Sequence, residues 1–270
     1  MPANKSKNLR SGDLGEEFGL YLLKPYTVIS QVPRTEDVGI DAIVTLLKNL
    51  DNRNYTAGNS FYLQLKSKSI STVQYSKDAI PWLLSLDLPL MYGIVDRLNF
   101  SIQLYSTAKL SEYIAVTKDI SEITIAFDDD YQMQDFSNHK EGSISIGPPI
   151  LDFEISKHND STFYETFYAI VAPHVQLLKE NLETRRFGFI YNISWKTNEI
   201  PKRQLWKSSL SAKNPGEGFE HIDNLMAPYF SVWLDECLRG KELETLEDRL
   251  DLLNKAKQAI QILSRPRDKS

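Results

Sequence analysis

Alternating apolar and polar residues predict a half-buried β-strand at residues 61–68. Apolar side chains occupy every second position from Phe61 to Leu65, and the positions between them are polar or amphipathic. Because successive side chains on a strand point to opposite faces, Gln64 and Lys66 lie side by side on the other face. An amide and an ammonium placed together must be solvated, paired or used, so this strand is the first candidate for chemistry.

Similar patterns predict the elements around this strand. Helical spacing of apolar residues predicts a helix over residues 12–23, and a polar, asparagine-rich turn is expected over residues 48–59. The dense apolar run that ends at Asp96 is typical of a central strand buried on both faces. The other expected elements are strands at 26–32, 38–46, 89–95 and 100–105 and a short helix at 76–86. Together they predict an α/β core with a mixed central sheet and flanking helices.

The pattern changes beyond about residue 130, where mainly helical segments are expected. The expected elements there are helices at 162–184, 219–238 and 242–263 and one strand at 187–195. Leucines at helical spacing in the last helix suit either an intramolecular core or a homodimer seam. The predicted organisation is a disordered tail at 1–10, an α/β domain at 11–130 and a mainly helical recognition or assembly region at 131–270.

Composition narrows the function classes. The chain has 270 residues, 41% of them hydrophobic and 25% charged, which argues against wholesale disorder. Its formal net charge of −5 counts against a protein that coats DNA, but not against an enzyme that touches nucleic acid transiently. A single cysteine, Cys237, excludes an intrachain disulfide, and neither a secretory signal nor a membrane-length apolar run is present. A soluble, cytoplasmic protein with no membrane contact is expected.

The expected strand at 38–46 carries one carboxylate, Asp41, which is costly to bury without a partner. Phosphodiester hydrolysis uses a hard divalent cation held by carboxylate and carbonyl oxygens, and a nearby ammonium that orients water or stabilises charge. Asp41 is therefore the candidate metal ligand, and Lys66 is the candidate positioning or charge-stabilising group. Gln64 is expected to support the site as a metal ligand through its amide oxygen, and the backbone carbonyl of Leu65 is an additional candidate ligand.

Three short motifs occur in order along the chain: Gly12-Asp13-Leu14-Gly15-Glu16, Gly39-Ile40-Asp41 and Gln64-Leu65-Lys66. On these residues, positions 11–106 resemble the restriction-endonuclease-like PD-(D/E)XK superfamily, and in particular its Mrr-type branch, in which glutamine replaces the second acidic residue. The strand expected near 90–96, after a helix that contains Trp82, also resembles a bacterial domain family found with defence genes.

This resemblance implies Mg²⁺ or Mn²⁺ as the cofactor and DNA as the commonest substrate. It also implies a setting in bacterial defence against foreign DNA, with protein partners in a defence complex. It adds Glu16, on the first helix, to Asp41, Gln64 and Lys66 as a catalytic residue and a further metal ligand. The resemblance covers little more than a third of the chain.

Several of these residues have simpler explanations. Glu16 lies three residues after Asp13, and the pair alternatively forms a capping box that opens the helix. Lys66 alternatively pairs with Asp41 as a structural ion pair, in this or an unrelated α/β fold, or ends the strand in solvent. Lys68, one pleat beyond Lys66, is either a phosphate contact or plain surface.

A second candidate nucleic-acid surface lies downstream. The basic residues Lys196, Lys202, Arg203 and Lys207 are interleaved with Trp195 and Trp206. This composition suits phosphate attraction combined with base stacking, with Lys202, Arg203 and Lys207 as the candidate nucleic-acid contacts. The alternative for these basic residues is a solvated loop.

Two functions follow from the sequence. The first is a Mg²⁺-dependent endonuclease that hydrolyses phosphodiester bonds, of DNA by resemblance, as the effector of an anti-phage or restriction-type defence system. The alternative is a catalytically inactive nuclease-fold module that binds or assembles through its C-terminal helices.

Overall fold

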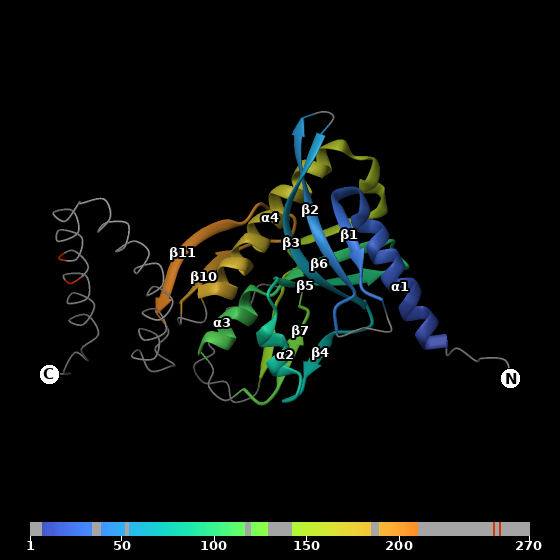
Figure 1. Cartoon of the computed structure of the whole chain (residues 1–270). Helices are drawn as coiled ribbons and strands as arrows, with labels where there is room; N and C mark the ends of the chain where they lie inside the picture. The colour runs from blue at the N-terminus through green and yellow to red at the C-terminus, as the bar shows by residue number, and fades with distance from the viewer. Residues whose placement is uncertain are drawn as a thin grey trace, which may run out of the picture. The chain divides into compact units, whose positions relative to one another are not determined.

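The computed structural model of the chain divides into two compact units, Met1–Asn214 and Pro215–Ser270. The structure describes residues 7–33, 39–51, 54–116, 120–128, 142–184 and 189–209, together with residues 251 and 254. All of these residues up to 209 belong to the first unit (Figure 1).

A six-stranded sheet in the order β1-β2-β3-β5-β6-β9 forms the centre of this unit. Within this sheet β3 and β5 run parallel, and the other four neighbouring pairs are antiparallel. The sheet is therefore mixed, as predicted. Its strands are β1 (Thr27–Gln31), β2 (Ala42–Asp51), β3 (Asn54–Ser67), β5 (Leu90–Asp96), β6 (Ser101–Ser106) and β9 (Leu151–Glu154).

Two long helices, α1 (Lys7–Leu23) and α4 (Ser161–Thr184), bury one face of the sheet. The chain enters β1 from α1 through a 3-10 turn, η1 (Lys24–Tyr26), and reaches α4 from β9 through η4 (Ile155–Asn159). Gly19 allows α1 to approach the sheet closely, because a Cβ there would lie 2.8 Å from Val95 Cγ2. The core on this face includes Leu63 and Leu65 of β3.

Smaller elements cover the other face of the sheet. They are α2 (Ile80–Ser85), α3 (Ala108–Val116) and a three-stranded sheet of β4 (Thr72–Tyr75), β7 (Ile123–Ala126) and β8 (Ser143–Ser145). Tyr92 and Ile94 of β5 and Tyr105 of β6 join this second core. The fold is thus a mixed α/β architecture in which the central sheet is buried on both sides. None of the helices in the described ranges is long and apolar enough to cross a membrane.

A separate two-stranded antiparallel ribbon, β10 (Phe189–Ser194) with β11 (Lys202–Ser209), follows α4. Strand β10 and the helix over 161–184 lie where the sequence predicts them. The helices predicted at 219–238 and 242–263 lie outside the described residues.

The polar turn predicted at 48–59 is wrong. Instead, β2 and β3 continue as a long hairpin whose register runs to the pair Asp51 and Asn54. Strand β1 pairs with β2 only as far as Leu46, and β5 pairs with β3 only from Tyr62 onward. Neither strand therefore flanks the end of the hairpin, where polar side chains remain solvated. The β2–β3 hairpin packs on α4, where the ring centroids of Tyr55 and Tyr164 lie 4.9 Å apart.

Two predicted boundaries also differ from the structure. Helix α1 begins at Lys7, so residues 7–10 belong to the helix, and only residues 1–6 of the predicted tail lie outside the described residues. The sheet continues beyond the predicted boundary at 130, because β9 pairs with β6 and the first unit extends to Asn214. The strands β4 and β9 have only four residues each, the shortest run over which alternation of apolar and polar residues indicates a strand.

Candidate functional site

Asp41 directly precedes β2 and is held by backbone hydrogen bonds on both sides. Its N–H donates to the Leu63 carbonyl and its carbonyl accepts from the Val32 N–H, each at 2.9 Å. Its carboxylate accepts a third bond, at 2.5 Å, from the N–H of Leu65. The carboxylate predicted to bind metal is therefore fixed against the strand that carries the Gln-x-Lys motif.

The register of β2 and β3 brings the predicted residues to one place. Ala42 pairs with Leu63, so Asp41 lies opposite Gln64, and side chains directly opposite one another share a face. Gln64 and Lys66 are on the face away from Leu63 and Leu65, as the alternation predicts. The N–H of Leu65 points toward Asp41, and its carbonyl points the same way because a strand residue directs both groups to one neighbour.

Gln64 is only 7% exposed, and its side chain takes part in a buried hydrogen-bond chain. The Tyr75 hydroxyl, from β4, donates to Gln64 Oε1 at 3.1 Å and lies 2.5 Å from the Tyr92 hydroxyl of β5. Burial raises the pKa of both tyrosines, so both phenols keep their protons at neutral pH. We call the series Tyr92, Tyr75 and Gln64 the tyrosine relay.

Gly39 forms the bend that leads into Asp41. Its φ of +88° favours glycine, and a Cβ there would lie 3.3 Å from Trp82 and 3.8 Å from Gln64 Nε2. The Trp82 ring in turn stacks on Tyr75, with centroids 6.0 Å apart. The segment before β2 thus packs against the same residues that hold Gln64.

Lys66 is half-buried at the end of β3. Its ammonium makes no ion pair or hydrogen bond with any residue that the structure describes. The alternative of a structural ion pair between Lys66 and Asp41 is therefore not observed. A cation at this position is available to an anionic ligand.

Glu16 lies within α1, and the capping-box explanation for it is wrong. The helix begins at Lys7, so Asp13 is an interior residue that cannot cap the N-terminus. Helix α1 packs through Gly19 on the face that carries Leu65, opposite the face of Gln64 and Lys66. The structure joins Asp41, Gln64 and Leu65 at one place but leaves Glu16 in another layer, and its role in the site stays a prediction.

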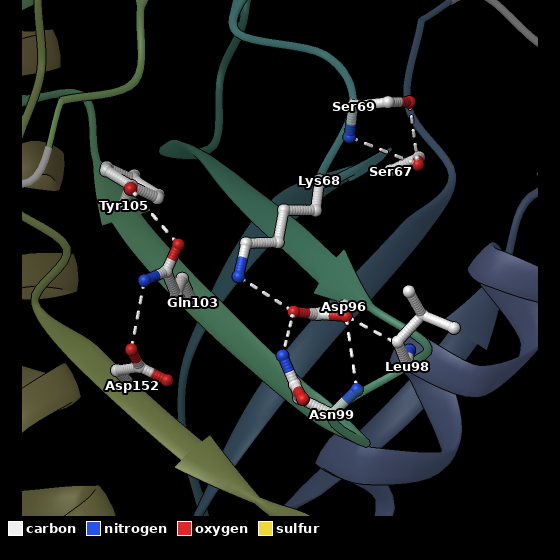
Figure 2. A network of polar contacts seen from close by, with 9 residues as sticks. All are labelled: Ser67, Lys68, Ser69, Asp96, Leu98, Asn99, Gln103, Tyr105 and Asp152. Atoms are coloured by element: carbon white, nitrogen blue, oxygen red, sulfur yellow. Dashed lines mark hydrogen bonds and ion pairs between the residues drawn. The ribbon is translucent and has the colours of Figure 1, made fainter.

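Lys68 forms an ion pair with Asp96, a residue to which the sequence analysis assigned no function. Its ammonium bonds Asp96 at 2.8 Å, and Figure 2 shows Asp96 also accepting from Asn99 and from the backbone of Leu98. The Lys68 bond, joined by those from Asn99 and Leu98, lowers the pKa of Asp96 to about 2. β3 and β5 are parallel, so this network lies at the same end of the sheet as Lys66. The phosphate contact of Lys68 stays a prediction.

Lys202, Arg203 and Lys207 lie on strand β11, not in a loop. Lys202 is exposed, whereas Trp195 is buried and donates its indole N–H to the Pro148 carbonyl at 2.8 Å. Trp195 is therefore not available for base stacking in the predicted patch.

Sequence reasoning missed Tyr75 and Tyr92, the two tyrosines that support Gln64. It quoted Gly39 and Trp82 as parts of motifs but did not predict that they pack against each other. Tyr75 ends a four-residue strand and Tyr92 reads as ordinary core. The signal that points to them is chemical: a nearly buried glutamine needs polar partners, and buried hydroxyls supply them.

The residues present fit a hard divalent cation. The Asp41 carboxylate and the Leu65 carbonyl, directed to the same side of β3, are oxygen donors of the kind that Mg²⁺ and Mn²⁺ prefer, and Mg²⁺ needs only one or two protein carboxylates. Within the described ranges, no group of three or more His, Cys, Asp or Glu side chains gathers as a metal cluster. Those ranges therefore hold no metal site built from protein carboxylates alone.

An apolar depression between α2, α3 and α4 is separate from Asp41 and Leu65. It is lined by Leu83, Leu86, Leu110, Leu178 and Leu182.

Comparisons with known proteins do not assign the chain to a family. No protein-family model matches it. Searches of curated proteins and of solved structures found no match either.

Proposed function

We propose that the protein is a metal-dependent nuclease whose active site lies where Asp41 meets β3. The observation that carries this proposal is the bond from the Leu65 N–H to the Asp41 carboxylate, which joins the Gly-Ile-Asp motif to the Gln-Leu-Lys motif. Its further support is the placement of the motifs: Gly-Ile-Asp directly precedes β2, Gln-Leu-Lys lies on the adjacent strand β3, and the first motif lies on the helix α1. This is the arrangement that the resemblance to the PD-(D/E)XK superfamily implies.

In this proposal Asp41 and the Leu65 carbonyl hold the cation, and Lys66 faces the scissile phosphate. A bound divalent cation supplies a water of lowered pKa and neutralises developing negative charge. The Lys66 ammonium, which no described residue engages, adds positive charge where the transition state becomes more negative or holds a water by hydrogen bonding. Half-burial of Lys66 strengthens both effects, because the local dielectric is below that of water.

DNA is the proposed substrate, and defence against foreign DNA is the proposed setting; both come from the resemblance. The test is cleavage of plasmid DNA, single-stranded DNA and RNA by purified protein with Mg²⁺ or Mn²⁺, and with EDTA. We expect metal-dependent cleavage of DNA that Asp41→Ala and Lys66→Ala each reduce by at least about a hundredfold. Asp87→Asn, an exposed carboxylate that bonds Tyr62 at 2.6 Å, is the matched control and should cleave normally.

Equal cleavage by wild type and both variants would overturn the assignment. Absence of cleavage and of metal binding in the wild type would favour the alternative, an inactive nuclease-fold module for binding or assembly.

A further inference from the structure

The tyrosine relay fixes which end of the Gln64 amide faces the site. The Tyr92 side chain is 0% exposed, and Tyr75 is the one hydrogen-bond partner of its hydroxyl among the described residues. An unsatisfied buried hydroxyl costs about 1–3 kcal/mol, so Tyr92 donates its proton to Tyr75. Tyr75 must then donate its own proton onward, to Gln64.

Only the carbonyl end of Gln64 can accept this bond, because an amide nitrogen has two donors and no acceptor. Oε1 is therefore turned toward Tyr75 and Nε2 toward the segment that leads into Asp41, where Nε2 lies 3.8 Å from the Cβ position of Gly39. The reverse amide orientation would leave the buried Tyr92 proton without an acceptor. The direction of the bonds thus selects one orientation of the amide.

Gln64 Nε2 makes no hydrogen bond to any residue of the described ranges, although the side chain is more than nine-tenths buried. Gln64 Nε2 is not among the polar atoms that are both fully enclosed and without a hydrogen-bond partner. This nitrogen therefore remains accessible to solvent or to a ligand. A nearly buried donor that faces the candidate site requires an acceptor from outside the protein.

We propose that Gln64 is a substrate-binding donor, which gives its Nε2–H to a non-bridging oxygen of the phosphodiester and is not an oxygen ligand of the metal. Tyr75 is the positioning residue that holds the amide in this orientation. The inference rests on the proposed nuclease function, and it assigns Gln64 a role different from the one the sequence predicts.

The test measures Mn²⁺ affinity by calorimetry without DNA, and DNA affinity by fluorescence anisotropy in EDTA. Loss of one hydrogen bond to a charged group predicts that Gln64→Met weakens DNA binding at least about tenfold. The same variant should leave the Mn²⁺ Kd within about twofold, since no ligand is lost. Tyr75→Phe, which frees the amide to turn, should weaken DNA binding in the same direction without changing Mn²⁺ affinity.

Tyr62→Phe is the matched control, because Tyr62 lies two residues earlier on the same face of β3 and bonds Asp87 instead. It should change neither affinity. A Gln64→Met variant that loses Mn²⁺ binding, as Asp41→Asn is expected to do, would overturn the inference and leave the proposed function intact. DNA affinity unchanged in both Gln64→Met and Tyr75→Phe would also overturn it. A wild-type protein that binds neither Mn²⁺ nor DNA would overturn the proposed function and the inference together.

Discussion

The carboxylate of Asp41 accepts a hydrogen bond from the backbone N–H of Leu65, with an oxygen-to-nitrogen distance of 2.5 Å. Leu65 lies between Gln64 and Lys66, so this bond fixes the acidic residue of one motif to the centre of another. Asp41 also continues the backbone pairing of β2 with β3 through its N–H. The geometry is built by the sheet itself and needs no ligand to assemble.

Replacing Asp41 tests how much this bond contributes to stability. Asp41→Ala leaves the Leu65 N–H without its acceptor and should lower the free energy of unfolding by about 1–3 kcal/mol. Asp41→Asn keeps a carbonyl oxygen that can accept the same bond and should cost less. Urea denaturation at pH 7 measures both values. Equal stability of the alanine and asparagine variants would contradict this role of the carboxylate.

Gly39→Ala should destabilise the protein by about 1–2 kcal/mol, because its φ of +88° disfavours a Cβ and the added carbon would press on Trp82. Gly12→Ala is the matched control. Gly12 lies inside α1 with nothing within 4 Å of its Cβ position, and alanine there should stabilise the helix by up to about 1 kcal/mol. Thermal unfolding of both variants checks the opposite signs, and a stabilised Gly39→Ala variant would contradict the strained bend.

His174 should make the protein sensitive to mild acid. The residue is 0% exposed, neither ring nitrogen bonds a described residue, and burial lowers its pKa from 6.5 to about 3. The unfolded chain therefore binds a proton that the folded chain does not between these two pH values. Stability is complete above pH 6.5 and falls as the pH drops toward 3, by about 1.4 kcal/mol per pH unit.

His174→Phe removes this titration while keeping a ring beside Trp195, whose centroid lies 5.2 Å away. The variant should match or exceed wild-type stability at pH 7.5, because a buried nitrogen without a partner is lost. It should lose less stability than the wild type between pH 6.5 and pH 4. Parallel pH profiles of unfolding free energy would show that His174 is not the acid-sensitive group.

The contribution of Asp96 to stability should be lost at a lower pH than that of His174. Its hydrogen bonds, led by the one from Lys68, lower its pKa from 3.8 to about 2. A lowered carboxyl pKa means that the contribution is complete above the unfolded value and is lost as the pH falls through about 2. Lys68→Met should therefore raise the pKa of Asp96 toward 3.8, which an NMR titration of its carboxyl carbon measures. An unchanged pKa would mean that the ion pair does not form in solution.

Patterns within one strand predicted the strand positions of the site. Alternation placed Gln64 and Lys66 on one face of β3, and a continuous apolar run placed β5 in the centre of the sheet. The relay from Tyr92 through Tyr75 to Gln64 was not predictable, because its bonds connect three strands and leave no periodic signal. Local hydropathy also failed for the end of the β2–β3 hairpin, which is polar and is stabilised by pairing and by contacts with α4.

A metal site at Asp41 is tested most sharply by a calorimetric titration of the wild-type protein and Asp41→Asn with Mn²⁺. We expect saturable binding to the wild type and a Kd at least about tenfold weaker for the variant, which keeps the acceptor for Leu65 but loses the charge. Equal binding by the two proteins, or none by the wild type, would contradict a metal site at Asp41.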